Sequence, residues 1–245
     1  MYRFFVEPSQ VEEHVIHILG SDVNHIKNVL RMKNGEEILV SSGENLEYTC
    51  YIEEMGSEEV LARIMYAQEA GYELSSRIYL FQGLPKGDKM ELIIQKAVEL
   101  GVHEVIPVAT RRSVMKLEGK KEENKIRRWQ AIATSAAKQS KRMYVPEVKG
   151  VMNFSQAAAY AKSLDVILLP YELAKGMKET KEIINNIRPG QSVGIFIGPE
   201  GGFDEGEVSL AQENGAKAIT LGKRILRTET AGLTVLSVLM FALEE

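Results

Sequence analysis

The chain has 245 residues, of which 44% are hydrophobic, and its formal net charge is −4. Its single cysteine, Cys50, excludes an internal disulfide framework, and it has neither an export signal nor an apolar stretch of the roughly 20 residues that span a bilayer. We therefore expect a soluble cytoplasmic protein with no membrane partner, built as one large domain or two small ones.

The first seventy or so residues predict a β-rich domain. Alternating apolar and polar residues over 36–41, 48–53 and 60–65 predict strands, and glycine-containing turns separate them. A helical stretch around 21–31, with Ser21 or Asp22 as its N-cap, interrupts the strands. We expect a small β-barrel over residues 1–72, with the linker to the next domain somewhere within 67–76.

From Arg77 onward, predicted strands alternate with predicted helices. The strands are expected at 78–84, 103–109, 165–170, 193–197 and 218–221, and the helices at 88–101, 125–142, 181–187, 204–214 and from 228 onward. Asp88 with Glu91, and Asp204 with Glu207, have the spacing of a helix capping box. This alternation predicts an α/β domain over 73–245, with a parallel sheet covered by helices on both faces.

The last predicted helix is apolar almost all round. Residues 231–243 carry apolar side chains interrupted only by threonine and serine. Such a helix is either central to the core or buried against a second subunit, and the pattern alone slightly favours the core.

Basic residues are concentrated in one segment. Residues 111–150 contain twelve Lys and Arg against four Glu, a net charge of +8, so the rest of the chain carries −12. The segment indicates either a surface that faces a polyanion or a solvated helical face. Residues 1–72 are acidic, with thirteen acids against five bases.

Two glycine-marked loops follow the last two predicted strands: GPEGGF at 198–203 and LGKRILRTET at 221–230. Ligands bind outside the carboxyl ends of strands in parallel sheets, so the two loops together predict one small-molecule site. A phosphate cradle is disfavoured, because four acids lie within 200–207 and no Walker-type lysine follows the glycines. The acids suit a cationic or hydroxyl-rich ligand, or some of them simply cap the helix.

Other catalytic signatures are missing from the sequence. It contains no GxSxG nucleophile elbow and no HExxH motif. The four histidines are not paired with cysteines, so we expect no metal site.

Further motifs accompany the two loops: KGDK at 86–89, KAVELG at 96–101, RW at 128–129, AKQSKR at 137–142 followed by Pro146, RFF at 3–5, and the histidine-to-arginine pattern at 25–31. Together with 198–203 and 221–231 they resemble the ribosomal RNA small subunit methyltransferase E family. That family belongs to the SPOUT class of S-adenosylmethionine-dependent enzymes. The resemblance spans nearly the whole chain, and the two C-terminal motifs are its most specific part.

The resemblance implies a PUA-like β-barrel, expected to bind RNA, over 1–72 and a SPOUT domain with a deep trefoil knot over 73–245. It implies a homodimer, to which the apolar helix at 231–243 would contribute. The implied reaction is methylation of uridine N3 in small-subunit (16S) ribosomal RNA, with S-adenosylmethionine as cofactor. The RNA partner is either naked ribosomal RNA or an assembled small ribosomal subunit.

The resemblance also implies that the knot loops hold the cofactor, namely the turn after Leu169 and Pro170, the loop at 198–202 and the loop at 221–226. The expected cofactor-binding residues are Leu169, Pro170, Ile197, Gly198, Pro199, Gly201, Gly202, Leu221, Gly222, Ile225, Leu226 and Thr230. Glu200 and Glu229 are candidate acceptors of the N3 proton, and Arg227 is a candidate stabiliser of negative charge on the uracil. Expected RNA contacts are Arg3, Lys27, Arg31, Lys33, Lys86, Arg112, Arg128, Lys138 and Arg142.

Three alternatives remain open from the sequence. A nucleotide-binding enzyme would use the loop at 198–203 for phosphate, and a non-enzymatic assembly factor would bind RNA without a cofactor. The acidic composition of residues 1–72 also allows that domain to act as a scaffold or to dock on a ribosomal protein.

Overall fold

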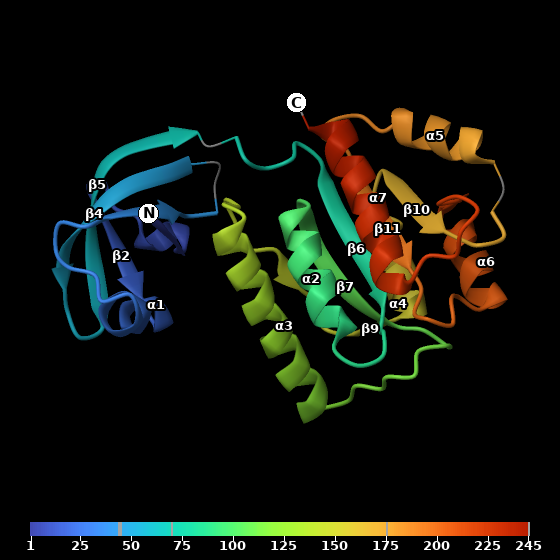
Figure 1. The fold of residues 1–245 in the computed structure, drawn as a ribbon, viewed down its shortest axis with the longest axis horizontal. Coiled ribbons are helices and arrows are strands. Elements are labelled where there is room, and N and C mark those ends of the chain that lie inside the picture. The colour runs from blue at the N-terminus through green and yellow to red at the C-terminus, as the bar shows by residue number, and fades with distance from the viewer. Residues whose placement is uncertain (44–45, 70, 175, 245) are drawn as a thin grey trace. The chain divides into compact units, whose positions relative to one another are not determined.

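The computed structural model describes residues 1–43, 46–69, 71–174 and 176–244, and it divides into two compact units (Figure 1). Unit 1 comprises Met1–Glu73 and Ala137–Val145, and unit 2 comprises Leu74–Ala136 and Pro146–Glu245. The prediction of an N-terminal domain over 1–72 did not include the second of these segments. Within the predicted linker, residue 70 lies outside the described residues.

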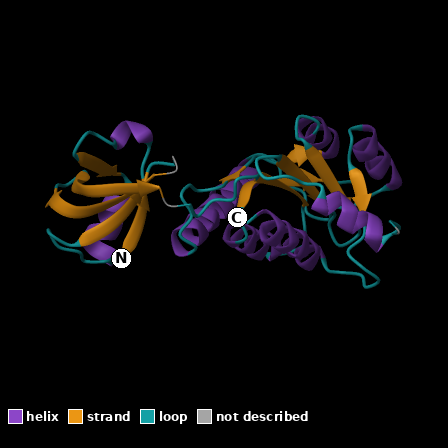
Figure 2. Cartoon of the chain, turned by 90° about the horizontal axis from the view of Figure 1, so that it is seen from above, coloured by secondary structure: helices purple, strands orange, loops and turns teal. Residues whose placement is uncertain are grey.

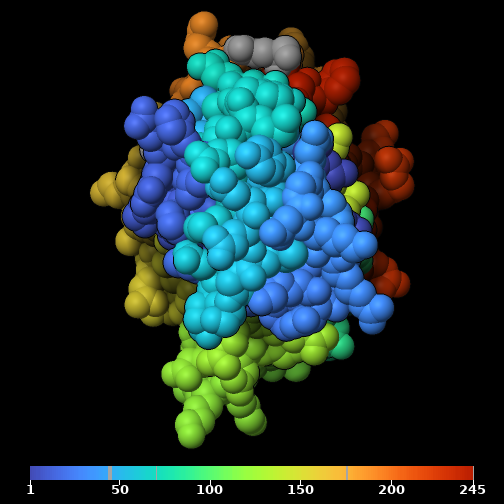
Figure 3. All heavy atoms as spheres, turned by 90° about the vertical axis from the view of Figure 1, so that its left-hand side faces the viewer, coloured from blue at the N-terminus to red at the C-terminus, as the bar shows by residue number. Residues whose placement is uncertain are grey.

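Unit 1 is built on a curled five-stranded sheet (Figure 2). Its elements are β1 (Tyr2–Phe5), β2 (Val15–Leu19), α1 (Ser21–Asn24), β3 (Glu37–Ser41), β4 (Leu46–Met55) and β5 (Glu59–Glu69). The strand order is β1-β3-β4-β5-β2, with β1 parallel to β3 and the other pairs antiparallel. Alternate side chains enter the core, so Ile16 and Ile18 of β2 are buried while His17 between them is partly exposed. Figure 3 shows one face of this unit, with β4 and β5 at its centre.

The three strands predicted for this unit are confirmed as β3, β4 and β5. Strands β1 and β2 were not predicted, because neither YRFF nor VIHIL shows a clear alternation of apolar and polar residues. The predicted helical stretch is one turn of α1 followed by a π-helical turn over His25–Val29. Neither Ser21 nor Asp22 caps it: the preceding residue is Gly20, whose φ of 67° lies in the left-handed region.

The second segment of unit 1 is held there by ion pairs. Arg142 Nη2 lies 2.7 Å from Glu73 Oε2, and the backbone N–H of Met143 donates to the same carboxylate at 2.6 Å. Lys138 Nζ lies 2.9 Å from Asp22 Oδ1. The Arg142 side chain is only 4% exposed, and the carboxylate of Glu73 compensates its buried charge.

Glu73→Gln is therefore expected to lower the free energy of unfolding by about 2 kcal/mol, because the neutral amide cannot form the buried ion pair with Arg142. Urea denaturation of the full chain measures the loss. Glu69→Gln, at the exposed end of β5, is the matched control and should change stability by less than about 0.5 kcal/mol. Equal effects of the two substitutions would show that the Arg142 pair contributes nothing.

Unit 2 contains an all-parallel sheet with helices on both faces (Figure 2). The strand order is β12-β10-β11-β6-β7-β8, and β9 also pairs with β7. Its strands are β6 (Arg77–Gly83), β7 (Val102–Ala109), β8 (Glu147–Val148), β9 (Met152–Asn153), β10 (Val166–Pro170), β11 (Ser192–Ile197) and β12 (Lys217–Ile219). Its helices are α2 (Lys89–Glu99), α3 (Lys120–Gln139, whose last residues belong to unit 1), α4 (Phe154–Ala161), α5 (Met177–Asn185), α6 (Glu205–Glu213) and α7 (Thr228–Leu243).

Two apolar layers enclose this sheet. On one face Phe81 and Phe196 stack at 4.5 Å and pack under α4 and α6. On the other face α7 packs on α2 and β11, and a Cβ added at Gly232 would lie 3.6 Å from Ile197 Cγ1. The predicted parallel sheet covered on both faces is thus confirmed.

Of the two predicted helix capping boxes, one is confirmed and one is wrong. The capping box of α6 is confirmed: Asp204 accepts from the N–H of Gly206, and Glu207 accepts from the N–H of Asp204 at 2.9 Å. The box proposed for α2 is wrong, because Asp88 makes no capping hydrogen bond and Glu91 pairs with Arg128 instead. The predicted helix at 125–142 runs over Lys120–Gln139, and β8, β9 and α4 were not predicted.

The chain order reverses beside β6. The chain first places β7 and β8 on one side of β6. It then places β10, β11 and β12 on the other side, where β11 lies next to β6 and β12 lies at the edge. In open parallel sheets a ligand crevice forms at such a reversal, outside the carboxyl ends of the strands. Within the described part of the chain, every helix is too short or too polar to cross a membrane.

Candidate functional site

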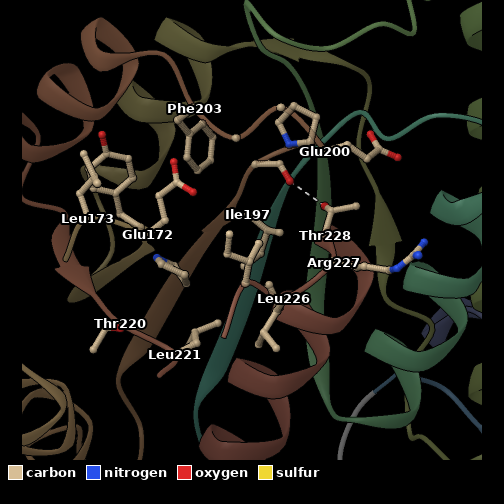
Figure 4. Close-up of a pocket in the computed structure, with 18 of the residues that line it drawn as sticks. Glu172, Leu173, Ile197, Glu200, Phe203, Thr220, Leu221, Leu226, Arg227 and Thr228 are labelled. Atoms are coloured by element: carbon tan, nitrogen blue, oxygen red, sulfur yellow. Dashed lines mark hydrogen bonds between the residues drawn. The ribbon is translucent and has the colours of Figure 1, made fainter. Parts of the chain in front are cut away.

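A pocket of about 640 Å³ opens at the carboxyl ends of β10, β11 and β12 (Figure 4). Its walls come from the segments that follow these three strands, residues 170–173, 197–203 and 220–228. Because the strands are parallel neighbours, their following loops meet at one edge of the sheet. The two glycine-marked loops predicted to enclose one ligand do lie together.

Close backbone approach holds these loops in place. A Cβ added at Gly83, the last residue of β6, would lie 2.7 Å from Pro199 Cδ, so only glycine fits there. Thr228, the first residue of α7, donates from its hydroxyl to the carbonyl of Gly198 at 2.6 Å and accepts from Gln82 Nε2 at 2.9 Å. These contacts fasten the start of α7 to the loop after β11.

Apolar side chains form the floor of the pocket. Ile197, Leu221 and Leu226 lie together in Figure 4, below a wall that carries Leu173 and Phe203. Ile225 is 87% exposed at the same pocket, so its side chain is accessible to a ligand. A flat apolar group fits this floor.

Charged side chains form the opposite end of the pocket. Lys89 Nζ lies 2.7 Å from Glu200 Oε1 and 3.7 Å from Glu229 Oε2. The backbone N–H of Lys86 also donates to Glu200. Figure 4 shows Arg227 extending on the same side as Glu200, away from the Leu173 wall.

The pKa values of this cluster follow from these contacts. Burial raises the pKa of the Glu200 carboxyl, but the hydrogen bonds from Lys89 and from backbone N–H groups outweigh burial and bring the pKa below its ordinary value. The hydrogen bond to Glu200 raises the pKa of the Lys89 ammonium. Both groups are charged at neutral pH.

The acids after the first glycine loop have separate roles. The backbone N–H of Arg111 donates to Glu207 Oε1 at 2.8 Å, and its guanidinium donates to Asp204 at 2.7 Å. Asp204 and Glu207 therefore cap α6 and hold the segment after β7, which leaves Glu200 and Glu205 as the acids of this loop that line the pocket. The predicted acidic cluster is thus only in part a ligand-facing feature.

Most of the predicted cofactor-binding residues line this pocket: Pro170, Ile197, Gly198, Pro199, Gly201, Gly202, Leu221, Gly222, Ile225 and Leu226. Leu169 is instead fully buried in the sheet, and Thr230 is exposed on α7 outside the lining. The turn after Pro170, expected to hold the cofactor, contributes Tyr171, Glu172 and Leu173 to the lining. The lining also contains residues that were not predicted: Lys89, Phe203, Thr220 and Thr228. Most of these residues directly follow a strand or begin a helix, and that position in the sequence is the signal that could have identified them as pocket residues.

Two of the predicted RNA contacts are buried, and their prediction needs correction. Arg3 is 7% exposed and paired with Glu47, and Arg142 is 3% exposed and paired with Glu73. Neither guanidinium presents its charge to a phosphate on the surface of unit 1.

The other predicted RNA contacts are at least partly accessible. Arg31, Lys33, Lys86, Arg112 and Arg128 are exposed, whereas Lys27 and Lys138 are half-buried. Several of them already have a protein partner: Lys27 donates to the carbonyl of Gly56, Arg112 to that of Gly201, and Lys138 pairs with Asp22.

Two family models match the chain. A model described as an RNA methyltransferase domain matches residues 72–240, and one described as an RNA methyltransferase PUA domain matches residues 18–65. The matches correspond to most of unit 2 and to the central strands of unit 1.

The chain is also similar to individual proteins over its full length. It is 39% identical to the ribosomal RNA small subunit methyltransferase E of Bacillus subtilis, covering 100% of this chain and 98% of the relative. It is 36% identical to the protein of the same name from Mesomycoplasma hyopneumoniae, covering 97% and 98%. A crystal structure of a ribosomal RNA small subunit methyltransferase E from Neisseria gonorrhoeae, bound to S-adenosyl methionine, superimposes with a TM-score of 0.82 at 31% identity, covering 98% of this chain and 97% of that one.

Proposed function

The chain belongs to the ribosomal RNA small subunit methyltransferase E family, and from this premise we propose that it methylates N3 of a uridine in small-subunit ribosomal RNA with S-adenosylmethionine. One observation carries the proposal. The pocket at the carboxyl ends of β10, β11 and β12 joins an apolar floor to a charged end, and the two glycine loops form its walls. Such a pocket suits a cofactor with an aromatic base and a reactive centre.

The residues present fit this cofactor. Ile197, Leu221 and Leu226 would hold the adenine, and the glycines at 198, 201 and 202 allow the backbone to approach it closely. S-adenosylmethionine, when bound, supplies a methyl group activated by a positively charged sulfur. The chain itself must orient the RNA base and manage the proton on N3.

We assign stabilisation of the uracil to Arg227. Loss of the N3 proton spreads negative charge over the uracil oxygens, and a guanidinium placed beside them stabilises that charge. Arg227 is exposed and lines the pocket, and among the described residues its guanidinium makes no hydrogen bond or ion pair, so its side-chain donors are available to a substrate.

We assign acceptance of the N3 proton to Glu229 rather than to Glu200. The Glu200 carboxylate is already bound by Lys89 and by the N–H of Lys86, and its lowered pKa makes it a weak base. Within the described residues, Glu229 Oε2 is buried and has no hydrogen-bond partner, 3.7 Å from Lys89. Glu200 then acts as an anchor that holds the loop after β11 against the start of α2.

We propose that exposed bases of unit 2 bind the RNA, with Lys86, Arg112 and Arg128 among them. The strongly basic segment 111–150 includes the exposed residues Lys120, Lys121 and Arg127 of α3. In unit 1, Lys27, Arg31, Lys33 and Lys138 remain candidates, and the PUA-type domain is consistent with RNA binding. RNA affinity that does not fall steeply with added salt would contradict this assignment.

Three finer features of the family resemblance are also proposals. The first is a knot, formed by the segments around the pocket. It is supported by the path of the chain, which leaves edge strand β12 and returns to α7 over β11.

The second is a homodimer, supported by Val238 and Phe241 of α7, which are 42% and 85% exposed although the opposite side of the helix is buried. Light scattering that gave the mass of one chain would contradict the dimer. The third is a cytoplasmic location, where ribosomal RNA is found and where cell fractionation would detect the protein.

The proposed function is tested in two steps. S-adenosylhomocysteine should raise the melting temperature of the protein, whereas ATP should not, because a ligand stabilises the state that it binds. Nucleosides from ribosomal RNA of cells that lack the protein should lack 3-methyluridine, and the purified enzyme should restore it. Stabilisation by ATP alone would favour a nucleotide-binding enzyme, and RNA binding without any cofactor effect would favour an assembly factor.

A further inference from the structure

Glu172 places a carboxylate without a counter-charge on the pocket wall. It lies in the segment after β10 and lines the pocket. The side chain is exposed and, as far as the described residues show, takes part in no hydrogen bond or ion pair. In Figure 4 it lies beside Leu173 and Phe203, on the wall opposite Glu200 and Arg227.

The other carboxylates around the pocket are compensated. Glu200 and Glu229 share the ammonium of Lys89. Glu205 is the first residue of α6, where the positive end of the helix dipole stabilises a negative charge. Glu172 sits on no helix and has mostly apolar neighbours, so a cationic ligand group would supply the compensation that the described chain does not.

We infer that Glu172 binds the α-ammonium group in the amino-acid tail of S-adenosylmethionine, an inference that rests on the proposed function. The cofactor carries two cationic groups, the sulfonium and this ammonium. The sulfonium must present its methyl group toward the charged end of the pocket, where Arg227 and Lys89 lie. Because the apolar floor suits the adenine, the tail is the part of the cofactor left for the Glu172 wall.

Such a contact makes Glu172 a residue that selects the cofactor by its tail. A charge-assisted hydrogen bond at the pocket mouth is partly exposed to water, so its effect on affinity should be moderate. Removal of the Glu172 carboxylate should weaken the binding of every ligand that carries the ammonium and of no ligand that lacks it.

Isothermal titration of the full chain with three ligands tests the inference. S-adenosylmethionine carries both cationic groups, S-adenosylhomocysteine carries only the ammonium, and 5′-methylthioadenosine carries neither. Glu172→Gln should weaken the first two by about tenfold each and should change the third by less than about twofold. Glu172→Asp, which keeps the charge, should recover part of the loss.

Each other outcome overturns the inference in a recognisable way. Loss confined to S-adenosylmethionine would mean that Glu172 faces the sulfonium, and equal loss for all three ligands would mean that it binds the ribose or shapes the pocket. No loss would mean no contact. The matched control is Glu205→Gln, another exposed pocket carboxylate, and a tail-selective loss in that variant would assign the ammonium to Glu205. Wild-type protein that bound none of the three ligands would overturn the proposed function, and this inference with it.

Discussion

Arg227→Ala is expected to lower kcat for RNA methylation by about 10²–10³-fold while leaving the affinity for S-adenosylhomocysteine unchanged, because a donor aimed at developing negative charge acts mainly in the transition state. Arg227 immediately precedes α7, and its backbone carbonyl accepts the N–H of Ala231. Its side chain is exposed, so truncation removes the guanidinium without opening a cavity. Single-turnover rates at saturating cofactor measure the effect on the chemical step.

The control for this prediction is Arg227→Lys. A lysine keeps the positive charge but loses the planar fork of donors, so this variant should recover only part of the rate. If Arg227→Ala retained full turnover with cofactor binding intact, the assignment of Arg227 to the uracil anion would be wrong.

The pocket could be predicted from sequence because its main signals are local. A short apolar run followed by glycines predicts a strand and a close backbone turn, and residues 193–203 carry both signals in sequence order. The capping box at Asp204 and Glu207 is equally local, and the structure confirms it. The apolar run after Thr228, which predicts the last helix, is also a local pattern.

Features that depend on distant partners could not be predicted in this way. Arg3 and Arg142 were interpreted as RNA contacts because they are basic residues within basic or family-like motifs. Their partners Glu47 and Glu73 lie 44 and 69 residues away along the chain, and nothing in the sequence links them. Lys89 was likewise missed, since its role emerges only when the loop after β11 brings Glu200 to the start of α2.

Glu172 was not singled out for a different reason, although the turn that contains it was expected to hold the cofactor. No motif surrounds it, and the segment after β10 carries no glycine until residue 176. Its position is set by the pairing of β10 between β11 and β12, which turns the following residues toward the pocket. A sheet order that is not sequential therefore contributes wall residues that a local pattern cannot identify.

Glu229→Gln is expected to lower the rate of methyl transfer by about 10²–10⁴-fold, because the amide keeps the shape of the side chain but cannot accept the N3 proton. The affinity for S-adenosylhomocysteine should be unchanged, since Glu229 is assigned to the RNA base and not to the cofactor. Single-turnover rates at saturating cofactor measure the effect.

The Glu200→Gln variant distinguishes the role of the Glu200 carboxylate from that of the Glu229 carboxylate. The lowered pKa of Glu200 means that the pair with Lys89 is fully formed above the ordinary pKa of a glutamate and is lost only as the pH falls through the lower value in the folded protein. Glu200 is thus ionised at every pH at which the enzyme would be assayed, and its titration cannot produce an acidic limb near neutrality. The Glu200→Gln variant should keep the shape of the wild-type pH profile. Its main loss should be the ion pair that joins Lys89 to the loop after β11. A Glu200→Gln variant that lost as much rate as Glu229→Gln would transfer the role of proton acceptor to Glu200.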